Sequence, residues 1–222
     1  MTSYCLVNNE KRFVFCVDPK CGCTTVKEWF KRILDKPEDK TKIRIEPFMV
    51  RANLVHTLDD YSRIWFVRDP FQCLISFYYQ FVVFQPKHWC FADHEKKQTL
   101  EERTFEEFIR IIGELHDRGQ RLQHHLQAQT RSLLDVPFDA IVKIENLEEQ
   151  KHELMTMVKT KAEPKHLNNQ KNSEIDMPNA FLLSPEELKN NTIYSYSSFW
   201  NDELLEIVKR VYFNDCELYN SL

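Results

Sequence analysis

The chain has 222 residues, of which 42% are apolar and 13% aromatic, with only 3 glycines and 9 prolines. This composition excludes collagen-like, low-complexity and disordered classes, and the length predicts one globular domain over residues 1–222. The 30 Lys and Arg against 34 Asp and Glu leave a formal charge of -4, which weakens the case for a nucleic-acid binder.

The sequence also indicates the cellular compartment and whether a metal is bound. No apolar run approaches the roughly 18 residues that a membrane span needs, and the N-terminus lacks the pattern of a signal peptide. Seven scattered cysteines are typical of reduced, buried thiols, and they lack the paired spacing of a zinc site. We therefore expect no membrane partner, no metal, and a cytoplasmic location or a catalytic domain cut from a longer parent.

The first half of the chain is predicted to alternate strands with helices. A strand over Arg12 to Asp18 is followed by a tight loop and by a helix from Thr24. Ile43 to Val50 is ambiguous between a short strand and an extended segment. A second strand covers Arg63 to Arg68, and Asp69-Pro70 then begins a helix.

The middle of the chain is predicted to hold a loop and two helices. Phe84 to Gln98 mixes aromatic residues, histidines and charges without a period, which is typical of a loop or lid. Thr104 to Glu107 has the form of a capping box, so a helix is expected to begin there. A further helix is predicted over Gln120 to Leu134.

The last part of the chain continues the alternation. A third strand is predicted over Asp139 to Glu145 and a helix from Leu147 to about Thr160. After a polar excursion over 161–183, Ser184 begins a short helix, and a last helix runs from about Asn201 to Leu218. Strands that alternate with helices predict an α/β fold with a short, mostly parallel sheet and helices on both faces.

Residues 19–25, which read PKCGCTT, have the features of a phosphate site. Backbone N–H groups at a helix start, the helix dipole and the Lys20 ammonium together attract an anion, and Gly22 allows close backbone approach. A Walker A loop would place its lysine after a second glycine, whereas Lys20 precedes Gly22 and no earlier glycine exists. An ATP-dependent kinase of a small molecule is therefore the weaker alternative.

Arg68 and Ser76 form a second candidate phosphate site. An arginine at the carboxyl end of a strand and a hydroxyl on the following helix can hold a second phosphate. Taken alone, the same residues favour an ion pair of Arg68 with Asp69 or another carboxylate, beside a tolerated helical serine.

Together the two sites resemble the nucleotide-binding signature of the sulfotransferase family that uses 3′-phosphoadenosine 5′-phosphosulfate (PAPS), closest to its carbohydrate sulfotransferase or family 2 branch. PKCGCTT is similar to the 5′-phosphosulfate loop and FVRDPFQCLISFYYQF to the 3′-phosphate motif, although the second Arg expected near position 73 is Cys73. HLQAQ at 125–129 is similar to the H-W-x-P-Q element, with Trp and Pro replaced. The resemblance covers nearly the whole chain, with FDAIVKIENLEEQ, HLNNQ and LLEIVKRVYFNDCELY following in the family's order.

The resemblance implies a P-loop-like, three-layer fold and an enzyme that transfers a sulfuryl group from PAPS to a hydroxyl, less often an amine, by in-line displacement. Positioning and charge stabilisation supply most of the acceleration in such a reaction, which requires no metal and leaves adenosine 3′,5′-bisphosphate. Lys20 is implied to be catalytic, at the oxygen that bridges sulfate and 5′-phosphate. The implied nucleotide-binding residues are Lys20, Cys21, Gly22, Cys23, Thr24, Thr25, Arg68 and Ser76.

A general base is expected near the acceptor, because an alcohol has a high pKa. His56, between the two nucleotide motifs, is the first candidate, Glu46 is the second, and His125 is a candidate to line the site. The alternative for His56 is the commoner one for a lone histidine, a partly buried structural residue.

The acceptor and two other classes of protein stay open. The mildly acidic chain has no long basic cluster for a polyanion, which favours a small natural product, whereas the resemblance favours a saccharide. A kinase would depend on Mg²⁺, and a non-catalytic scaffold with the same fold would bind nucleotide without turnover. The oligomeric state is not indicated by the sequence.

Overall fold

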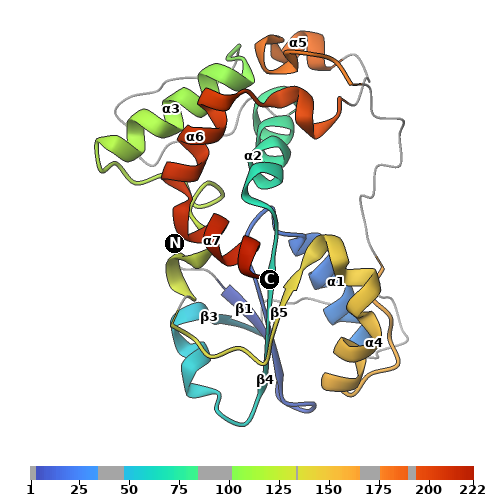
Figure 1. Cartoon of the computed structure of the whole chain (residues 1–222). Coiled ribbons are helices and arrows are strands. Elements are labelled where there is room, and N and C mark those ends of the chain that lie inside the picture. The colour runs from blue at the N-terminus through green and yellow to red at the C-terminus, as the bar shows by residue number, and fades with distance from the viewer. Residues whose placement is uncertain (1–3, 35–47, 85–101, 134, 166–175, 190–193) are drawn as a thin grey trace. The chain divides into compact units, whose positions relative to one another are not determined.

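The computed structural model describes residues 4–34, 48–84, 102–133, 135–165, 176–189 and 194–222 (Figure 1). The chain divides into two compact units. The first comprises Met1–Arg68, Gln129–Asn169 and Tyr219–Leu222, and the second comprises Asp69–Ala128 and Gln170–Leu218. The single sulfotransferase domain over residues 1–222 stays a prediction.

The first unit contains a five-stranded sheet in the order β3-β1-β2-β4-β5. Strands β2, β4 and β5 are parallel, while β1 pairs antiparallel with both β2 and β3, so that β1 alone runs against the other four. The predicted α/β class with a mostly parallel sheet is confirmed. The strands are β1 Tyr4–Asn8, β2 Phe13–Val17, β3 Met49–Arg51, β4 Ser62–Val67 and β5 Ala140–Lys143.

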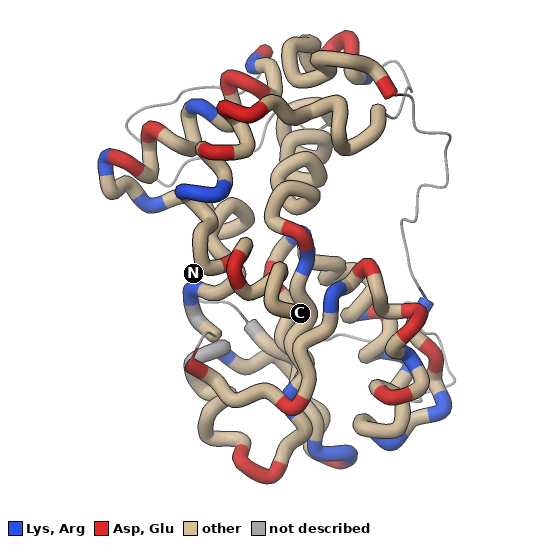
Figure 2. Tube along the Cα trace, in the orientation of Figure 1, with Lys and Arg blue, Asp and Glu red and all other residues tan. Residues whose placement is uncertain are grey.

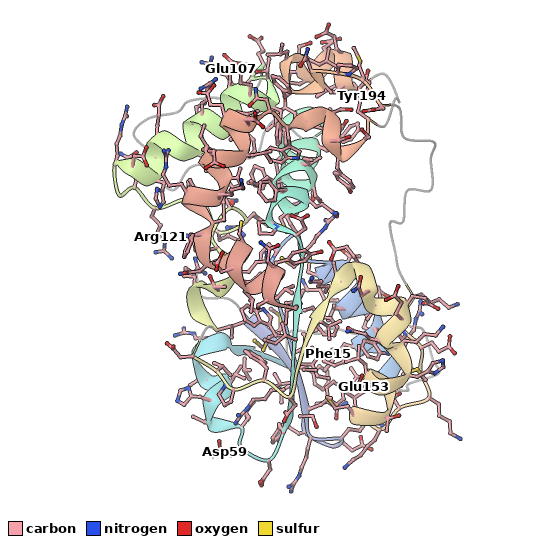
Figure 3. The ribbon with its side chains drawn as sticks, viewed as in Figure 1. Phe15, Asp59, Glu107, Arg121, Glu153 and Tyr194 are labelled. Carbon is pink, nitrogen blue, oxygen red and sulfur yellow. The ribbon has the colours of Figure 1, made fainter. Side chains whose placement is uncertain are left out.

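Helices flank this sheet, and aromatic rings fill the layer between them. On one face, Phe15 of β2 stacks on Trp29 of α1 at a centroid distance of 4.9 Å and meets Phe66 of β4 at 5.2 Å (Figure 3). On the other face of β4, Trp65 packs against Phe138 at 5.2 Å. The helical segments of this unit are α1 Cys23–Ile33, η3 Ala52–Thr57, η5 Gln129–Ser132, η6 Ile144–Asn146 and α4 Leu147–Met157.

The second unit is built from helices around an apolar core. Phe77 of α2 stacks on Phe108 of α3 at a centroid distance of 5.6 Å, and α6 packs along α3. The capping box predicted at Thr104 is confirmed at the start of α3. The helical segments of the second unit are α2 Pro70–Tyr78, η4 Tyr79–Phe84, α3 Phe105–Asp117, η7 Ala180–Leu182, α5 Pro185–Leu188, η8 Tyr196–Phe199, α6 Asp202–Val211 and α7 Phe213–Ser221. The second unit ends at Leu218, within α7.

The helix predicted over Gln120 to Leu134 is wrong. Within the described part of this segment only η5 is helical, and the residues before it form turns. Two backbone carbonyls of this segment accept hydrogen bonds from side chains and not from the backbone N–H groups of a helix. The Gln127 amide donates to Leu122 O at 2.6 Å, and the Tyr212 hydroxyl donates to Leu126 O at 2.7 Å. Leucines at helical spacing are therefore buried in this segment although it forms no α-helix.

The last helix, predicted as one piece, is interrupted at Tyr212. Its backbone leaves the helical region at φ -114° and ψ 35°, between α6 and α7. The side chain of Tyr212 is buried and its hydroxyl bonds to Leu126 O, so that burying this residue outweighs one continuous helix. The segment Ile43 to Val50, which was ambiguous from the sequence, ends in β3, which contains its last two residues. Residues 43–47 lie outside the described residues.

Candidate functional site

The loop of residues 18–22, here called the β2–α1 loop, connects the carboxyl end of β2 directly to α1. Two of its residues have left-handed backbone angles, Lys20 with φ 70° and Gly22 with φ 76°. The Cys21 N–H donates to Asp18 O at 3.2 Å, and Val26 N–H to Gly22 O at 3.0 Å. These bonds close a tight turn from which the helix begins without a linker.

Gly22 is required by its surroundings as well as by its backbone angle. A Cβ atom at this position would lie 2.4 Å from Cγ1 and 2.8 Å from Cδ1 of Ile144, which is closer than real Cβ contacts. Ile144 begins η6, immediately after β5. The β2–α1 loop therefore packs directly against the segment that follows β5, the parallel strand on the far side of β4.

The N-terminus of α1 differs from those of α2, α3, α5 and α6. Side chains of Asp69, Thr104, Ser184 and Asn201 cap α2, α3, α5 and α6. Within the described residues, no side chain caps α1 and its first turn contains no acidic residue. The first N–H groups of a helix have no intrahelical acceptor and lie at the positive end of its dipole, so this N-terminus suits an anion.

The predicted nucleotide residues of the first motif are distributed around this turn. Cys21 is buried, Cys23 is half-buried at the first helical position, Thr24 is exposed and Thr25 is buried. The Cys21 thiol donates to Gln129 Oε1 at 3.0 Å and lies 3.6 Å from Pro19 O. Cys21 thus faces the interior, whereas Thr24 faces solvent.

Arg68 lies beside the β2–α1 loop. It follows β4, and the parallel pairing of β2 with β4 places the carboxyl ends of both strands at one edge of the sheet. Its Nη1 donates to Lys20 O at 3.1 Å, across 48 residues of sequence. The structure therefore brings Arg68 against the loop that contains Lys20 and Gly22, and the role of these residues in nucleotide binding stays a prediction.

The sequence did not single out Glu145, the acidic neighbour of Arg68. Its Oε1 lies 3.7 Å from Arg68 Nε, with about a quarter of the Glu145 side chain exposed (26%). The alternative partner named from the sequence, Asp69, instead accepts from Phe71 N–H at the start of α2. Glu145 was predicted only as the last residue of a strand, and no local signal marked it.

The remaining predicted residues are not joined to this edge by the described contacts. Ser76 on α2 and His125 belong to the second unit, so their part in the site stays a prediction. His56 is exposed on η3, three residues before Asp59 (Figure 3). The next residue after Asp59, Asp60, forms an ion pair with Arg12 at 3.5 Å, near the amino end of β2. Glu46 lies outside the described residues.

Three further observations concern the described part of the chain alone. In it, no group of three or more His, Cys, Asp or Glu is placed to hold a metal ion. None of the helices within the described ranges is long and apolar enough to cross a bilayer. Six cysteines in these ranges are thiols that form no disulfide: Cys5, Cys16, Cys21, Cys23, Cys73 and Cys216.

The first unit has the P-loop-like arrangement, with a strand, a short loop and a helix at the carboxyl edge of a mostly parallel sheet. A family model described as sulfotransferase family matches residues 3–220. The match covers nearly the whole chain, and the protein belongs to the sulfotransferase family; the resemblance based on PKCGCTT and FVRDPFQCLISFYYQF is confirmed. Membership identifies it as a transferase domain of the sulfotransfer type. No curated protein and no solved structure matches the chain.

Proposed function

We propose that the protein transfers a sulfuryl group from PAPS to the hydroxyl, less often the amine, of a small natural product or saccharide. Family membership supports sulfotransfer in general. The observation that carries the proposal is the 3.1 Å hydrogen bond from Arg68 Nη1 to Lys20 O, because it joins the two predicted phosphate motifs at one edge of the sheet. Two cations beside an uncapped helix N-terminus form a site for an anionic co-substrate.

Each residue of this edge has a role in the proposal. The N–H groups of α1 and the hydroxyls of Thr24 and Thr25 hold the 5′-phosphate. Arg68, with Ser76, holds the 3′-phosphate. The Lys20 ammonium stabilises the negative charge that grows on the bridging oxygen as its bond to sulfur breaks. The tight β2–α1 loop fits this role, because the left-handed backbone angles of Lys20 and Gly22 place Lys20 close to the start of α1.

The reaction is a direct displacement at sulfur. The acceptor oxygen forms the new bond to sulfur, the bond from sulfur to the bridging oxygen breaks, and adenosine 3′,5′-bisphosphate leaves. The acceptor proton passes to a general base, for which His56 is our first candidate and Glu46 our second, while His125 is a candidate to line the site. No metal enters the scheme.

The acceptor class and location are proposed from charge and cysteine chemistry. Acidic and basic residues both occur along α3 and α6, and neither helix carries a continuous basic stripe, as Figure 2 shows. Such a mixed surface favours a small acceptor over a heparan-type polyanion. A cytoplasmic location is supported by the free thiols of Cys5 and Cys16, which face each other across β1 and β2.

Calorimetric titration with adenosine 3′,5′-bisphosphate, beside ADP with and without Mg²⁺, tests the proposal. We expect metal-independent binding of the bisphosphate that Arg68→Ala weakens about tenfold to hundredfold, since charge-assisted hydrogen bonds are lost. The matched control is Arg12→Ala in the same unit, whose side chain pairs with Asp60 near the amino end of β2. It should leave the affinity unchanged.

The other outcomes of this titration are equally specific. A preference for Mg-ADP would replace the sulfotransferase with the kinase. A folded chain that binds neither nucleotide would indicate the non-catalytic scaffold. Assays with a saccharide panel beside a panel of small alcohols then separate the two acceptor classes.

A further inference from the structure

The Gln129 side chain connects the β2–α1 loop to the residue that follows β4. We infer that Gln129 is a positioning residue of the nucleotide site, which holds Lys20 and Arg68 in a fixed relation to each other. The inference rests on the proposed function, and it assigns a role to a residue that contacts neither the acceptor nor the sulfuryl group in that scheme.

Both backbone groups of Arg68 bond to the Gln129 amide. The Arg68 N–H donates to Oε1 at 3.0 Å, and Nε2 donates to Arg68 O at 2.8 Å. These two bonds fix the amide orientation, because a backbone N–H can only donate and a carbonyl can only accept. They hold the Arg68 backbone as a neighbouring strand would, directly beyond the end of β4.

The third hydrogen bond reaches the other motif. The Cys21 thiol donates to the same Oε1 at 3.0 Å, across 108 residues of sequence. Cys21 stands between Lys20 and Gly22, so this bond restrains the loop at its centre. A single amide thus contacts the two elements that carry the proposed nucleotide cations.

Burial makes these bonds consequential. Gln129 is only 7% exposed and Cys21 is fully buried. Buried polar groups that lose their partners cannot recover them from water, so the loop and Arg68 would shift to find others. Without Gln129, the described link between the two motifs is the one from Arg68 Nη1 to Lys20 O, which involves a flexible side chain.

Only glutamine satisfies all three groups. In Gln129→Met the side chain keeps a similar length but offers neither a donor nor a strong acceptor. In Gln129→Glu the acceptor remains, but an ionised carboxylate cannot donate to Arg68 O and adds negative charge beside the proposed anion site. We expect both variants to bind adenosine 3′,5′-bisphosphate about tenfold or more weakly, as lost buried hydrogen bonds imply.

The test combines calorimetry of the full chain, well below its unfolding temperature, with hydrogen exchange of the peptide that contains Arg68. The control is Gln150→Met in the same unit, where the Oε1 atom is buried without a hydrogen-bond partner. We expect the control to keep wild-type affinity. We expect Gln129→Met to weaken binding and to speed exchange at the Arg68 amide, which a merely structural loss elsewhere would leave slow.

A double-variant cycle shows whether Gln129 acts through Arg68. In the Arg68→Ala background, Gln129→Met should reduce affinity much less than in the wild type, because the group that it positions is gone. If Gln129→Met does not fold, Gln129→Glu takes its place in each measurement.

The outcomes separate this inference from the proposed function. If the wild type binds the bisphosphate and the folded Gln129 variants bind it equally well, the positioning role is overturned while the proposed function stands. Additive effects of Gln129→Met and Arg68→Ala would also overturn it. If the wild type does not bind the bisphosphate, the proposed function fails, and the role of Gln129 in it fails as well.

Discussion

A Cβ atom on Gly22 would lie 2.4 Å from Cγ1 of Ile144, and Gly22 has a φ of 76°. Two separate costs therefore oppose any side chain at this position, steric overlap and left-handed strain. Because Ile144 follows β5, the contact also shows that the β2–α1 loop depends on the third parallel strand for its shape.

Gly22→Ala should lower the free energy of unfolding by about 3 kcal/mol or more, from left-handed strain and overpacking together. The matched control is Gly119→Ala, where φ is 65° but no atom lies within 4 Å of the added Cβ. The control should cost only the roughly 1–2 kcal/mol of backbone strain. Urea unfolding of both variants measures the difference, and equal losses would contradict the steric argument.

Lys20 separates side-chain chemistry from backbone strain. Lys20→Ala should reduce kcat about 10²- to 10³-fold, since the ammonium stabilises charge that develops in the transition state. The affinity for adenosine 3′,5′-bisphosphate should fall as well, because the bridging oxygen leaves with that product as a charged oxygen of its 5′-phosphate. A large loss of product affinity with unchanged kcat would reverse the assigned role.

A second substitution at Lys20 tests the backbone. Lys20 has a φ of 70°, which glycine adopts without the penalty of a Cβ. Lys20→Gly should therefore be as inactive as Lys20→Ala but more stable than it by about 1 kcal/mol in urea unfolding. Equal stability of the two variants would argue against a strained loop.

Glu145 places a negative charge 3.7 Å from the Arg68 guanidinium. Glu145→Gln keeps the size of the side chain and removes a charge that repels a bound phosphate. We expect the dissociation constant of the bisphosphate to fall a few-fold, and the effect to shrink as salt increases. Weaker binding by the variant would mean that Glu145 acts mainly by orienting Arg68.

The start of α3 should contribute a pH-dependent part of the stability. The Thr104 backbone N–H donates to Glu107 at 2.9 Å and lowers the pKa of that carboxyl, and Arg103 acts in the same direction. A lowered folded-state pKa means that this stabilisation is present above the unfolded pKa of Glu107. It is lost as the pH falls through the lower, folded value.

Urea unfolding at neutral pH and near pH 3 measures this effect. Glu107→Gln should reduce the loss of stability on acidification, whereas Glu153→Gln, an exposed carboxylate on α4, should not (Figure 3). At neutral pH, Thr104→Ala should cost about 1 kcal/mol through the lost cap. An unchanged acid response in Glu107→Gln would contradict the role of the capping box.

Short-range patterns in the sequence determined much of this protein. Short runs of β-branched and aromatic residues predicted β2, β4 and β5, and the Asp69-Pro70 and Thr104 to Glu107 signals located the starts of α2 and α3. These elements depend on residues a few positions apart, so the local sequence is sufficient to predict them. The same holds for the PKCGCTT turn, whose lysine and glycine lie within three positions of each other.

Only the tertiary structure decided which residues meet at the carboxyl edge of the sheet. Gln129 bonds to Arg68 across 61 residues and to Cys21 across 108, and no local pattern predicts such pairs. The failed helix over 120–134 has in part the same origin, because Leu126 O accepts a hydrogen bond from the Tyr212 hydroxyl across 86 residues. A hydrogen bond within one helix and a bond to a distant side chain satisfy a carbonyl equally well, and the packing of the whole fold determines which forms.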